Sequence, residues 1–524
     1  MGKEAVLGRR AGALVPLFSI PSSESWGLGE IADLPAFAAW ARRAGLSAVQ
    51  LLPVNEMADG QSSPYSALSA MAIDPIFIAV RDVPEFAESG GEASLTHQQR
   101  HRLAELRRSS SVRHREAREL KTAVLRMLFE RFLETQWRTD GPRAVRMRAY
   151  AEREGWWLRD YTLFRALHAE HGACFWRDWP APVRDRDPQA LQRAAEALRH
   201  EVLYYEWLQW IADEQWHAAR RDSPGVAILG DFPFMVSRDS ADVWSRQDQF
   251  NVDASVGVPP DAFSETGQDW GLPLYRWDVH EADGYEWLHQ RARRCAGLFD
   301  GFRVDHLVGF YRTYARDGEL AYFSPPEEPE QLAQGERLMA IFQGSGAAII
   351  AEDLGTVPDF VRDSLDRIGV PGLKVMRWER EWKAEGQPFK DPETYPPVSV
   401  AISGTHDTET MAEWWDNADP DERASVVALS RLCAAAITAE SPYVPVVRDA
   451  LLDTLFAAGS DLLLLPVQDV FGWRDRINTP AVVNDENWCW QLPWNVEALD
   501  EQPEAVERAA FLRQLAGATN RLRT

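Results

Sequence analysis

The feature of this sequence that most constrains its fold is a series of eight short apolar runs along the 524 residues. Each run is followed by polar residues and a turn, which is typical of strands buried on both faces of a parallel sheet. Amphipathic segments with helical spacing lie between several runs, such as residues 34–45 and 356–369. The runs are residues 14–20, 47–54, 226–234, 301–307, 347–354, 372–378, 398–407 and 461–470. Eight strands alternating with helices predict an α/β fold, a closed (β/α)8 TIM barrel.

Two intervals between the runs are too long to be simple connections. Residues 56–225 contain long charged helical stretches, including residues 97–137 and 201–221, and predict a mainly helical subdomain inserted after the second strand. Residues 238–300 are rich in Gly, Pro, Asp and Trp and predict a second inserted subdomain after the third strand, a loop region of a length that is usually functional. We therefore expect a single catalytic barrel domain over residues 1–524 that carries both insertions.

Composition narrows the classes of partner. The formal net charge of -24 argues against nucleic acid and anionic membranes, because both require a basic surface. No apolar stretch approaches the roughly 18 residues of a membrane span, and the N-terminus lacks the apolar core of a secretion signal. The four cysteines match no metal or redox spacing, and no compact metal motif occurs elsewhere. We expect a cytoplasmic protein without a metal or cofactor.

Three acids stand where a barrel enzyme places its chemistry, at the carboxyl ends of the fourth, fifth and seventh predicted strands. They are Asp305, Glu352 and Asp407. Two carboxylates can cleave a glycosidic bond, one as nucleophile and the other as acid/base. Arg303 lies two residues before Asp305, so strand periodicity places both side chains on the same face, where the guanidinium is expected to lower the pKa of Asp305.

Each of these patterns also has a less specific interpretation. Most Arg-x-Asp pairs are ordinary salt bridges, and Glu352 in a Glu-Asp-Leu-Gly turn can be purely structural. His406 and Asp407 can form a metal site, part of a catalytic triad, or a pair of ligands for sugar hydroxyls. The patterns GxSxG, HExxH, GxGxxG and Walker A are absent, which argues against serine hydrolase, zinc protease, dinucleotide and P-loop chemistry. The 22 Trp and 12 Tyr suit the apolar faces of pyranose rings, but composition alone favours core packing as their explanation.

Taken together, the sequence resembles the 4-α-glucanotransferases of the amylomaltase (disproportionating enzyme) type, glycoside hydrolase family 77. The segment GVPPDAFSETGQDWGLPLYRW (257–277) is close to diagnostic for this family. The other motifs that carry the resemblance are GFRVDHLVGF (301–310), AEDLGTV (351–357), SGTHDTET (403–410), LGDFPFMVSRDSADVW (229–244), SSPYSALSA (62–70), RINTP (476–480) and NWCW (487–490). They follow the family's order over nearly the whole chain.

The resemblance implies roles for individual residues. Asp305 matches the nucleophile, Glu352 the acid/base and Asp407 the stabiliser of the transition state. The residues that it implies in substrate binding are Ser63, Tyr65, Asp231, Asp261, Gln268, Trp270, Arg303, His406 and Asn478. The chain departs from the family at Ala481, where Gly is usual, at Gln491, where Arg is common, and in HDTET, where HDNDT is usual.

The implied reaction moves α-1,4-glucan segments between maltooligosaccharides or starch-type glucans through a covalent β-glycosyl-Asp intermediate. The expected acceptors are glucose and short maltooligosaccharides. The acids alone do not separate transfer from hydrolysis, because water and a sugar hydroxyl are equivalent nucleophiles. An α-amylase-like hydrolase is therefore the alternative enzyme, and a non-catalytic glucan-binding scaffold is the alternative outside catalysis.

Overall fold

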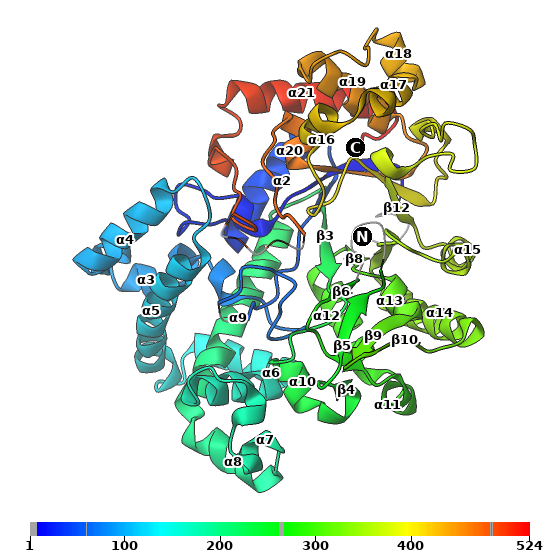
Figure 1. Ribbon diagram of the computed structural model, residues 1–524. Coiled ribbons are helices and arrows are strands. Elements are labelled where there is room, and N and C mark those ends of the chain that lie inside the picture. The colour runs from blue at the N-terminus through cyan, green and yellow to red at the C-terminus, as the bar shows by residue number, and fades with distance from the viewer. Residues whose placement is uncertain are drawn as a thin grey trace.

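The computed structural model describes residues 8–58, 60–260, 267–480, 482, 484 and 486–523. Eight parallel strands close into a barrel in the order β1-β14-β13-β12-β11-β8-β3-β2, which confirms the predicted TIM barrel (Figure 1). The strands are β1 (Arg10–Leu14), β2 (Ala48–Gln50), β3 (Ala227–Phe232), β8 (Gly301–Val304), β11 (Ala348–Ala351), β12 (Gly372–Val375), β13 (Ser399–Ile402) and β14 (Leu462–Pro466). Seven of them lie inside the predicted apolar runs.

The first predicted strand, residues 14–20, is misplaced. The strand ends at Leu14, and residues Leu17–Ser19 form a 3-10 turn instead. Pro16 has no backbone N–H, so it cannot continue the strand ladder. The run is apolar because the turn is itself buried, with Leu17 and Phe18 each 2% exposed. The apolar run at residues 14–20 therefore reflects the burial of this turn and not a strand.

The barrel interior is a separate apolar cluster built from alternate strand positions. On β11, Ala348 and Ile350 face the interior, whereas Ile349 and Ala351 pack outward in the larger core. This alternation is what a strand buried on both faces requires. The outer core lies between the barrel and its helices, whose main members are α2 (Leu34–Arg43), α12 (Glu286–Leu298), α14 (Glu328–Gly344), α15 (Asp359–Ile368), α19 (Pro445–Phe456), α20 (Val467–Phe471) and α21 (Pro503–Ala518).

The chain between β2 and β3 is largely helical. Its longest helices, α6 and α9, pack along each other on the side of the barrel where Figure 1 shows the cyan and green helices. The helices are α3 (Pro84–Glu88), α4 (His97–Arg108), α5 (His114–Phe132), α6 (Pro142–Glu170), α7 (Ala181–Arg184), α8 (Pro188–Ala197) and α9 (Arg199–Arg221).

The chain between β3 and β8 joins a sheet that the sequence does not predict. Strands β5 (Ser255–Val258) and β6 (Gln268–Asp269) pair with the hairpin β9 (Thr313–Asp317) and β10 (Leu320–Ser324), in the order β10-β9-β5-β6. The hairpin follows β8, so this small sheet ties the chain before and after the fourth barrel strand together. It rises beside the carboxyl end of β8, where Asp305 lies.

The bottom of the barrel is closed by the C-terminal segment. The Arg521 side chain is fully buried and donates five hydrogen bonds to backbone carbonyls, of which those to Phe456 and Ala458 are 2.8 and 2.6 Å long. The remaining three carbonyls belong to Arg10, Ser460 and Asp461. No helix in the described part of the chain is long and apolar enough to cross a membrane.

We predict that Arg521→Ala destabilises the barrel by at least about 2 kcal/mol, because five backbone carbonyl oxygens lose a charged donor and only two of them, those of Ala458 and Ser460, keep a hydrogen bond from Arg9. Urea unfolding followed by tryptophan fluorescence measures the loss. The matched control is Arg523→Ala, which removes an exposed arginine two residues further on and should leave the unfolding midpoint unchanged. Equal midpoints for the two variants would contradict a role of Arg521 in closing the barrel.

Candidate active site

Barrel register brings the first two acids together. Asp305 and Glu352 directly follow β8 and β11, which pair so that Val304 lies beside Ala351. Each acid also extends the ladder with its own amide: Asp305 N–H donates to Phe232 O at 3.0 Å and Glu352 N–H to Val304 O at 3.1 Å. Neighbouring strand ends in a parallel barrel therefore place the two carboxylates at the same rim, as the sequence predicts.

Arg303 connects three carboxylates. Its Nη1 contacts both oxygens of Asp231 at 2.8 and 2.6 Å, and its Nη2 contacts Asp305 Oδ1 at 3.1 Å and Glu352 Oε2 at 3.0 Å. Asp231 is the register partner of Arg303 on β3, so the strand pairing fixes this contact. Arg303 is only 5% exposed, and burial among these acids makes it the sole close positive charge that they share within the described residues.

The shared nitrogen also limits the separation of the two catalytic acids. Because Asp305 Oδ1 and Glu352 Oε2 each lie about 3 Å from Arg303 Nη2, these two oxygens are at most about 6 Å apart. Retaining glycosidases hold their carboxyl groups about 5–5.5 Å apart, whereas inverting enzymes need roughly 6.5–9.5 Å to admit a water molecule. The geometry therefore favours retention.

The expected effect of Arg303 on Asp305 is opposed by burial. The ion pair is present and lowers the pKa of the Asp305 carboxyl, but burial raises it more, and the charge of Glu352 raises it further. The net shift of the Asp305 pKa is upward, so the sequence-based expectation of a lowered pKa is wrong. A single guanidinium shared by three acids does not compensate for withdrawing Asp305 from water.

Asp407 has the opposite electrostatic environment. Its Oδ1 accepts a 2.6 Å hydrogen bond from Asn478 Nδ2, and its Oδ2 lies 3.3 Å from His406 Nε2. Burial alone would raise the pKa of Asp407, but the charge of His406 and the hydrogen bonds from His406 and Asn478 lower it to about 2. Burial likewise disfavours a charged His406, yet Asp407 raises the pKa of this imidazole. Asp407 is thus held ionised, and its negative charge in turn favours the charged form of His406.

Tyr65 links the two halves of the site. Its hydroxyl donates to Asp231 Oδ2 at 2.9 Å, and its ring stacks on His406 with 5.2 Å between centroids and an interplanar angle of 18°. Ser63 supports this loop, because its Oγ accepts the Tyr65 N–H at 3.4 Å. The structure thus brings Tyr65 to the acids directly and Ser63 only through Tyr65.

The loop after β5 supplies the aromatic wall. The Trp270 ring meets His306 edge to face, with 4.6 Å between centroids, and its Nε1 donates to Gln268 Oε1 at 3.1 Å. His306, which follows the nucleophile candidate, donates its backbone N–H to Glu352 Oε2 at 2.5 Å. Gln268 therefore orients Trp270 beside the acids. Asp261, also predicted here, lies outside the described residues.

Sequence reasoning missed two residues that shape the site. Asp469 lies just after β14 and holds both ends of the loop that carries Asp407: it accepts from Ser403 Oγ and from the Met411 N–H at 2.6 Å. The same rule of acids at strand ends identifies Asp469 in the run 461–470. Trp488 packs on Tyr65 at 5.9 Å between centroids, and no local pattern separates it from a core tryptophan.

Among the residues described, no group of three or more His, Cys, Asp or Glu side chains is arranged to hold a metal ion. The arrangement offers carboxylates, one guanidinium and aromatic faces. A parallel barrel with two acids on one arginine and a third ionised acid opposite defines the class of enzymes that break and form glycosidic bonds.

The comparison with known families identifies the branch of this class. The family model of 4-alpha-glucanotransferase, glycoside hydrolase family 77, matches residues 15–497, and the chain belongs to this family. It is similar to the 4-alpha-glucanotransferase of Thermus thermophilus, with 34% identity over 98% of this chain and 100% of the relative. The 4-alpha-glucanotransferase of Chlamydia pneumoniae is 30% identical over 93% of this chain and 92% of the relative.

A solved structure agrees with this assignment. The amylomaltase from Streptococcus agalactiae in complex with acarbose matches with a TM-score of 0.81 and 25% identity, over 98% of this chain and 100% of that one. The amylomaltase from Corynebacterium glutamicum shares the fold, with a TM-score of 0.80 over 96% of this chain and 75% of that one. The predicted family and enzyme class, a 4-α-glucanotransferase acting on α-1,4-glucans, are confirmed.

We predict that Asn478→Ala raises the pKa of Asp407 from about 2 towards its ordinary value of about 3.9, because the carboxylate loses a hydrogen bond to its charged form. A lowered pKa in the folded state stabilises the fold above the unfolded pKa, and this contribution is lost as the pH falls towards 2. The variant should therefore lose less thermal stability than the parent between pH 5 and pH 3. An equal loss in both proteins would contradict the assignment.

Proposed function

We propose that this enzyme transfers α-1,4-glucan segments by retaining double displacement, with Asp305 as nucleophile, Glu352 as acid/base and Asp407 as stabiliser of the transition state. The observation that carries this proposal is the contact of Asp305 and Glu352 with one nitrogen of Arg303. That contact supports the short separation that a covalent intermediate needs.

In the first step Glu352 donates its proton to the glycosidic oxygen while the bond from that oxygen to the anomeric carbon breaks. Asp305 attacks the same carbon from the opposite face and forms a β-glycosyl ester. Oδ1 of Asp305 is held by Arg303, whereas Oδ2 accepts only a longer bond, 3.3 Å, from the Phe234 N–H. We assign the attack to Oδ2, because this oxygen has only the weaker hydrogen bond to give up.

In the second step the ionised Glu352 takes the proton of the 4-hydroxyl of an incoming glucan. The freed oxygen attacks the anomeric carbon, and the ester bond to Asp305 breaks. Asp407, ionised at neutral pH, accepts hydrogen bonds from hydroxyls of the reacting sugar and favours its distorted form. No step requires a metal or an organic cofactor, and we expect activity to survive a chelator.

The remaining residues of the site have proposed roles in substrate binding. Arg303 and Asp231 keep the catalytic carboxylates in place, and Tyr65 with its neighbour Ser63 lines the cleft beside them. His406 and Asn478 hold Asp407. The loop residues Asp261, Gln268 and Trp270 are proposed to receive the acceptor, which we expect to be glucose or a short maltooligosaccharide.

We also propose that residues 56–225 and 238–300 act as subdomains of a single catalytic unit over residues 1–524. The helices between β2 and β3 support the first of these subdomains, whereas strands β5 and β6 of the second share their sheet with β9 and β10, which lie beyond residue 300. A cytoplasmic location is a further proposal. The free thiols of Cys174, Cys295 and Cys433 suit a reducing compartment, and cell fractionation tests it.

The proposed reaction is tested by incubating the protein with maltotriose alone. We expect a ladder of longer maltooligosaccharides with release of glucose and little gain of reducing ends. Asp305→Asn should keep the fold and lower this transfer by at least about 10³-fold, because no nucleophile remains. Turnover within tenfold of the parent would remove Asp305 from the proposed role.

Trp270→Ala should raise the ratio of hydrolysis to transfer several-fold. The ring is proposed to bind an acceptor sugar and to exclude water next to Glu352, and removing it admits water. Product chromatography with a reducing-end assay measures the ratio. The matched control is Trp382→Ala, an exposed tryptophan of another loop. The same ratio in the Trp270 variant and the parent would mean that this loop does not select the acceptor.

A further inference from the structure

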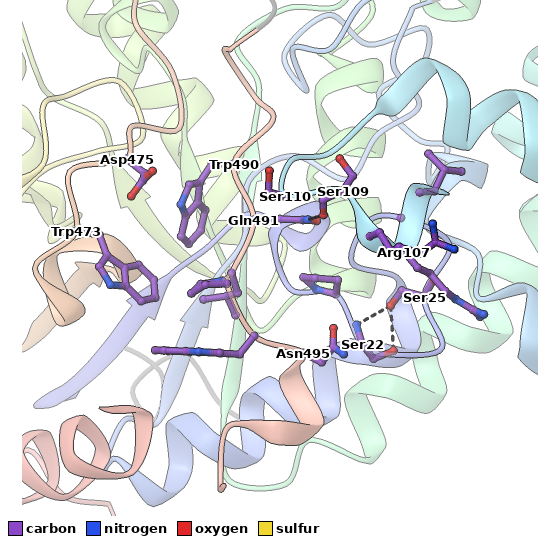
Figure 2. A pocket seen from close by; sticks show the side chains of 17 residues that line it. Ser22, Ser25, Arg107, Ser109, Ser110, Trp473, Asp475, Trp490, Gln491 and Asn495 are labelled. Carbon is purple, nitrogen blue, oxygen red and sulfur yellow. Dashed lines mark hydrogen bonds between the residues drawn. The ribbon is translucent and has the colours of Figure 1, made fainter. Parts of the chain in front are cut away.

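Two cavities in the described part of the chain lie apart from the three catalytic acids and differ in charge. Figure 2 shows the first, of about 580 Å³, which is lined by serine hydroxyls and by indole rings such as those of Trp473 and Trp490. Two arginines line it, and one of them, Arg107, is already paired with Glu92 at 2.7 Å. The second cavity, of about 830 Å³, lies between α6, α9 and α12, and we call it the arginine pocket. Its volume is within the roughly 300–1,000 Å³ of small-molecule sites.

The arginine pocket gathers cations in a chain that is strongly acidic as a whole. Four arginines and one histidine line it together with three carboxylates, although the chain carries a formal net charge of -24. The cationic side chains are those of Arg153, Arg221, Arg293, Arg294 and His217. A hollow lined by an excess of one sign of charge concentrates ligands of the opposite sign, so this pocket favours an anion.

Asp213, the most buried carboxylate of the pocket, is neutralised by its neighbours. Its Oδ1 lies 3.3 Å from Arg294 Nη1, and its Oδ2 lies 3.4 Å from both Arg153 Nη2 and His217 Nδ1. Burial raises the pKa of Asp213, but the hydrogen bond with His217 and the charge of Arg294 lower it by more. The same hydrogen bond raises the pKa of His217. One carboxylate therefore has three cationic partners.

The other two carboxylates of the pocket are engaged as well. Glu214 pairs with Arg146, an arginine outside the pocket, at 3.3 Å. Glu154 accepts hydrogen bonds from Arg153 Nε and from Trp157 Nε1, each 2.9 Å long. No carboxylate of the pocket is thus left to balance the remaining arginines.

Those arginines keep free donors. The side chains of Arg221 and Arg293 are exposed and have no ion pair or hydrogen bond with any residue that the structure describes. Arg294 is 7% exposed: its Nε donates to Met71 O at 3.0 Å and its Nη1 to Asp213, but its Nη2 is buried without a hydrogen-bond partner among the described residues. An unsatisfied buried donor is costly, so an acceptor beside Nη2 is favoured.

The helix dipole explains only part of this arrangement. Arg221 stands in the last turn of α9, where the dipole favours a cation. Arg293 and Arg294 stand before the last turn of α12, which contains no basic residue. Their position beside Arg221 therefore has no explanation in the stability of α12 alone, and it brings a second pair of guanidinium groups to the pocket.

One aromatic ring completes the pocket. Trp156 lines it, and its ring meets that of Trp157 edge to face with 6.5 Å between centroids. Trp157 is 4% exposed, and the Arg294 guanidinium lies 5.1 Å from the centroid of its ring. Trp157 thus supports both Trp156 and Arg294. A flat apolar face beside several guanidinium groups suits an anion that carries an organic ring.

We propose that the arginine pocket binds a small phosphate monoester, with the guanidinium groups on the phosphate oxygens and Trp156 against the organic ring. Arginine is suited to this task because its paired N–H groups match the spacing of phosphate oxygens. The ends of α9 and α12 lead into the amino ends of β3 and β8, whereas Asp305 follows the carboxyl end of β8. The ligand therefore takes no part in glucan transfer, and the inference does not depend on the proposed function.

Isothermal titration calorimetry tests this binding. The probes are glucose 1-phosphate, AMP and inorganic phosphate, with glucose as the neutral control. We expect at least one of the two monoesters to bind with a Kd below about 1 mM and glucose to give no comparable signal in the same site. Tighter binding of glucose 1-phosphate identifies a sugar as the organic part, and tighter binding of AMP identifies a nucleoside.

Variants locate the binding. The double variant Arg221→Ala, Arg293→Ala should weaken the monoester at least about tenfold, because it removes the two unpaired guanidinium groups. Trp156→Ala should weaken the monoester several-fold and leave the affinity for inorganic phosphate unchanged. The matched control is Arg115→Ala, Arg193→Ala, which removes two exposed arginines of α5 and α8 outside the pocket and should bind as the parent does.

Three results would overturn the proposal. The first is the absence of binding by both monoesters. The second is an equal affinity of the parent and the Arg221, Arg293 double variant, or an equal loss in the control, which would mean diffuse attraction to surface arginines. The third is binding of inorganic phosphate alone, which would rule out an organic phosphate as the ligand. Because the titration needs no turnover, its outcome is separate from the formation of a ladder from maltotriose.

Discussion

The contacts of Arg303 are the constraint on which the catalytic centre depends. One buried guanidinium holds Asp231, Asp305 and Glu352 at 2.6–3.1 Å and fixes the spacing of the two acids that perform the chemistry. Three carboxylates around one cation leave the cluster with an excess of negative charge. Burial raises the pKa of Asp305 and Asp231. The site is thus prepared for a sugar that develops positive charge at its anomeric carbon, and such a sugar relieves the excess negative charge.

The third acid is held by a different part of the barrel. Asp407 takes its low pKa from His406 and Asn478, and its loop is fixed at both ends by Asp469. Tyr65 joins this region to the Arg303 cluster through its hydroxyl and its ring. Two electrostatic environments therefore meet across one tyrosine, one with a raised carboxyl pKa and one with a lowered carboxyl pKa. Such a division assigns distinct tasks to chemically identical groups.

Much of this centre is predictable from the sequence because it follows from strand register. Asp305 and Glu352 come directly after buried apolar runs, and parallel pairing alone brings them to one rim. Register also explains the pairing of Asp231 with Arg303. The first strand was misplaced because the turn at Leu17–Ser19 is as apolar as a strand, and periodicity cannot separate these two forms of burial.

The features that the sequence did not predict depend on contacts between distant segments. The sheet that joins β5 to β9 and the stacking of Tyr65 on His406 bring together residues with no shared local pattern. The direction of the net pKa shift of Asp305 was also not predictable from the sequence, because it depends on how far burial outweighs the ion pair with Arg303.

The most direct test of this account is to trap the covalent intermediate. Glu352→Gln should still react with α-maltotriosyl fluoride, whose leaving group needs no acid, but it lacks the base for the second step. Peptide mass spectrometry should then find a maltotriosyl ester on Asp305. An ester on another carboxylate, or a product of inverted configuration without any ester, would contradict the retaining mechanism that the Arg303 cluster supports.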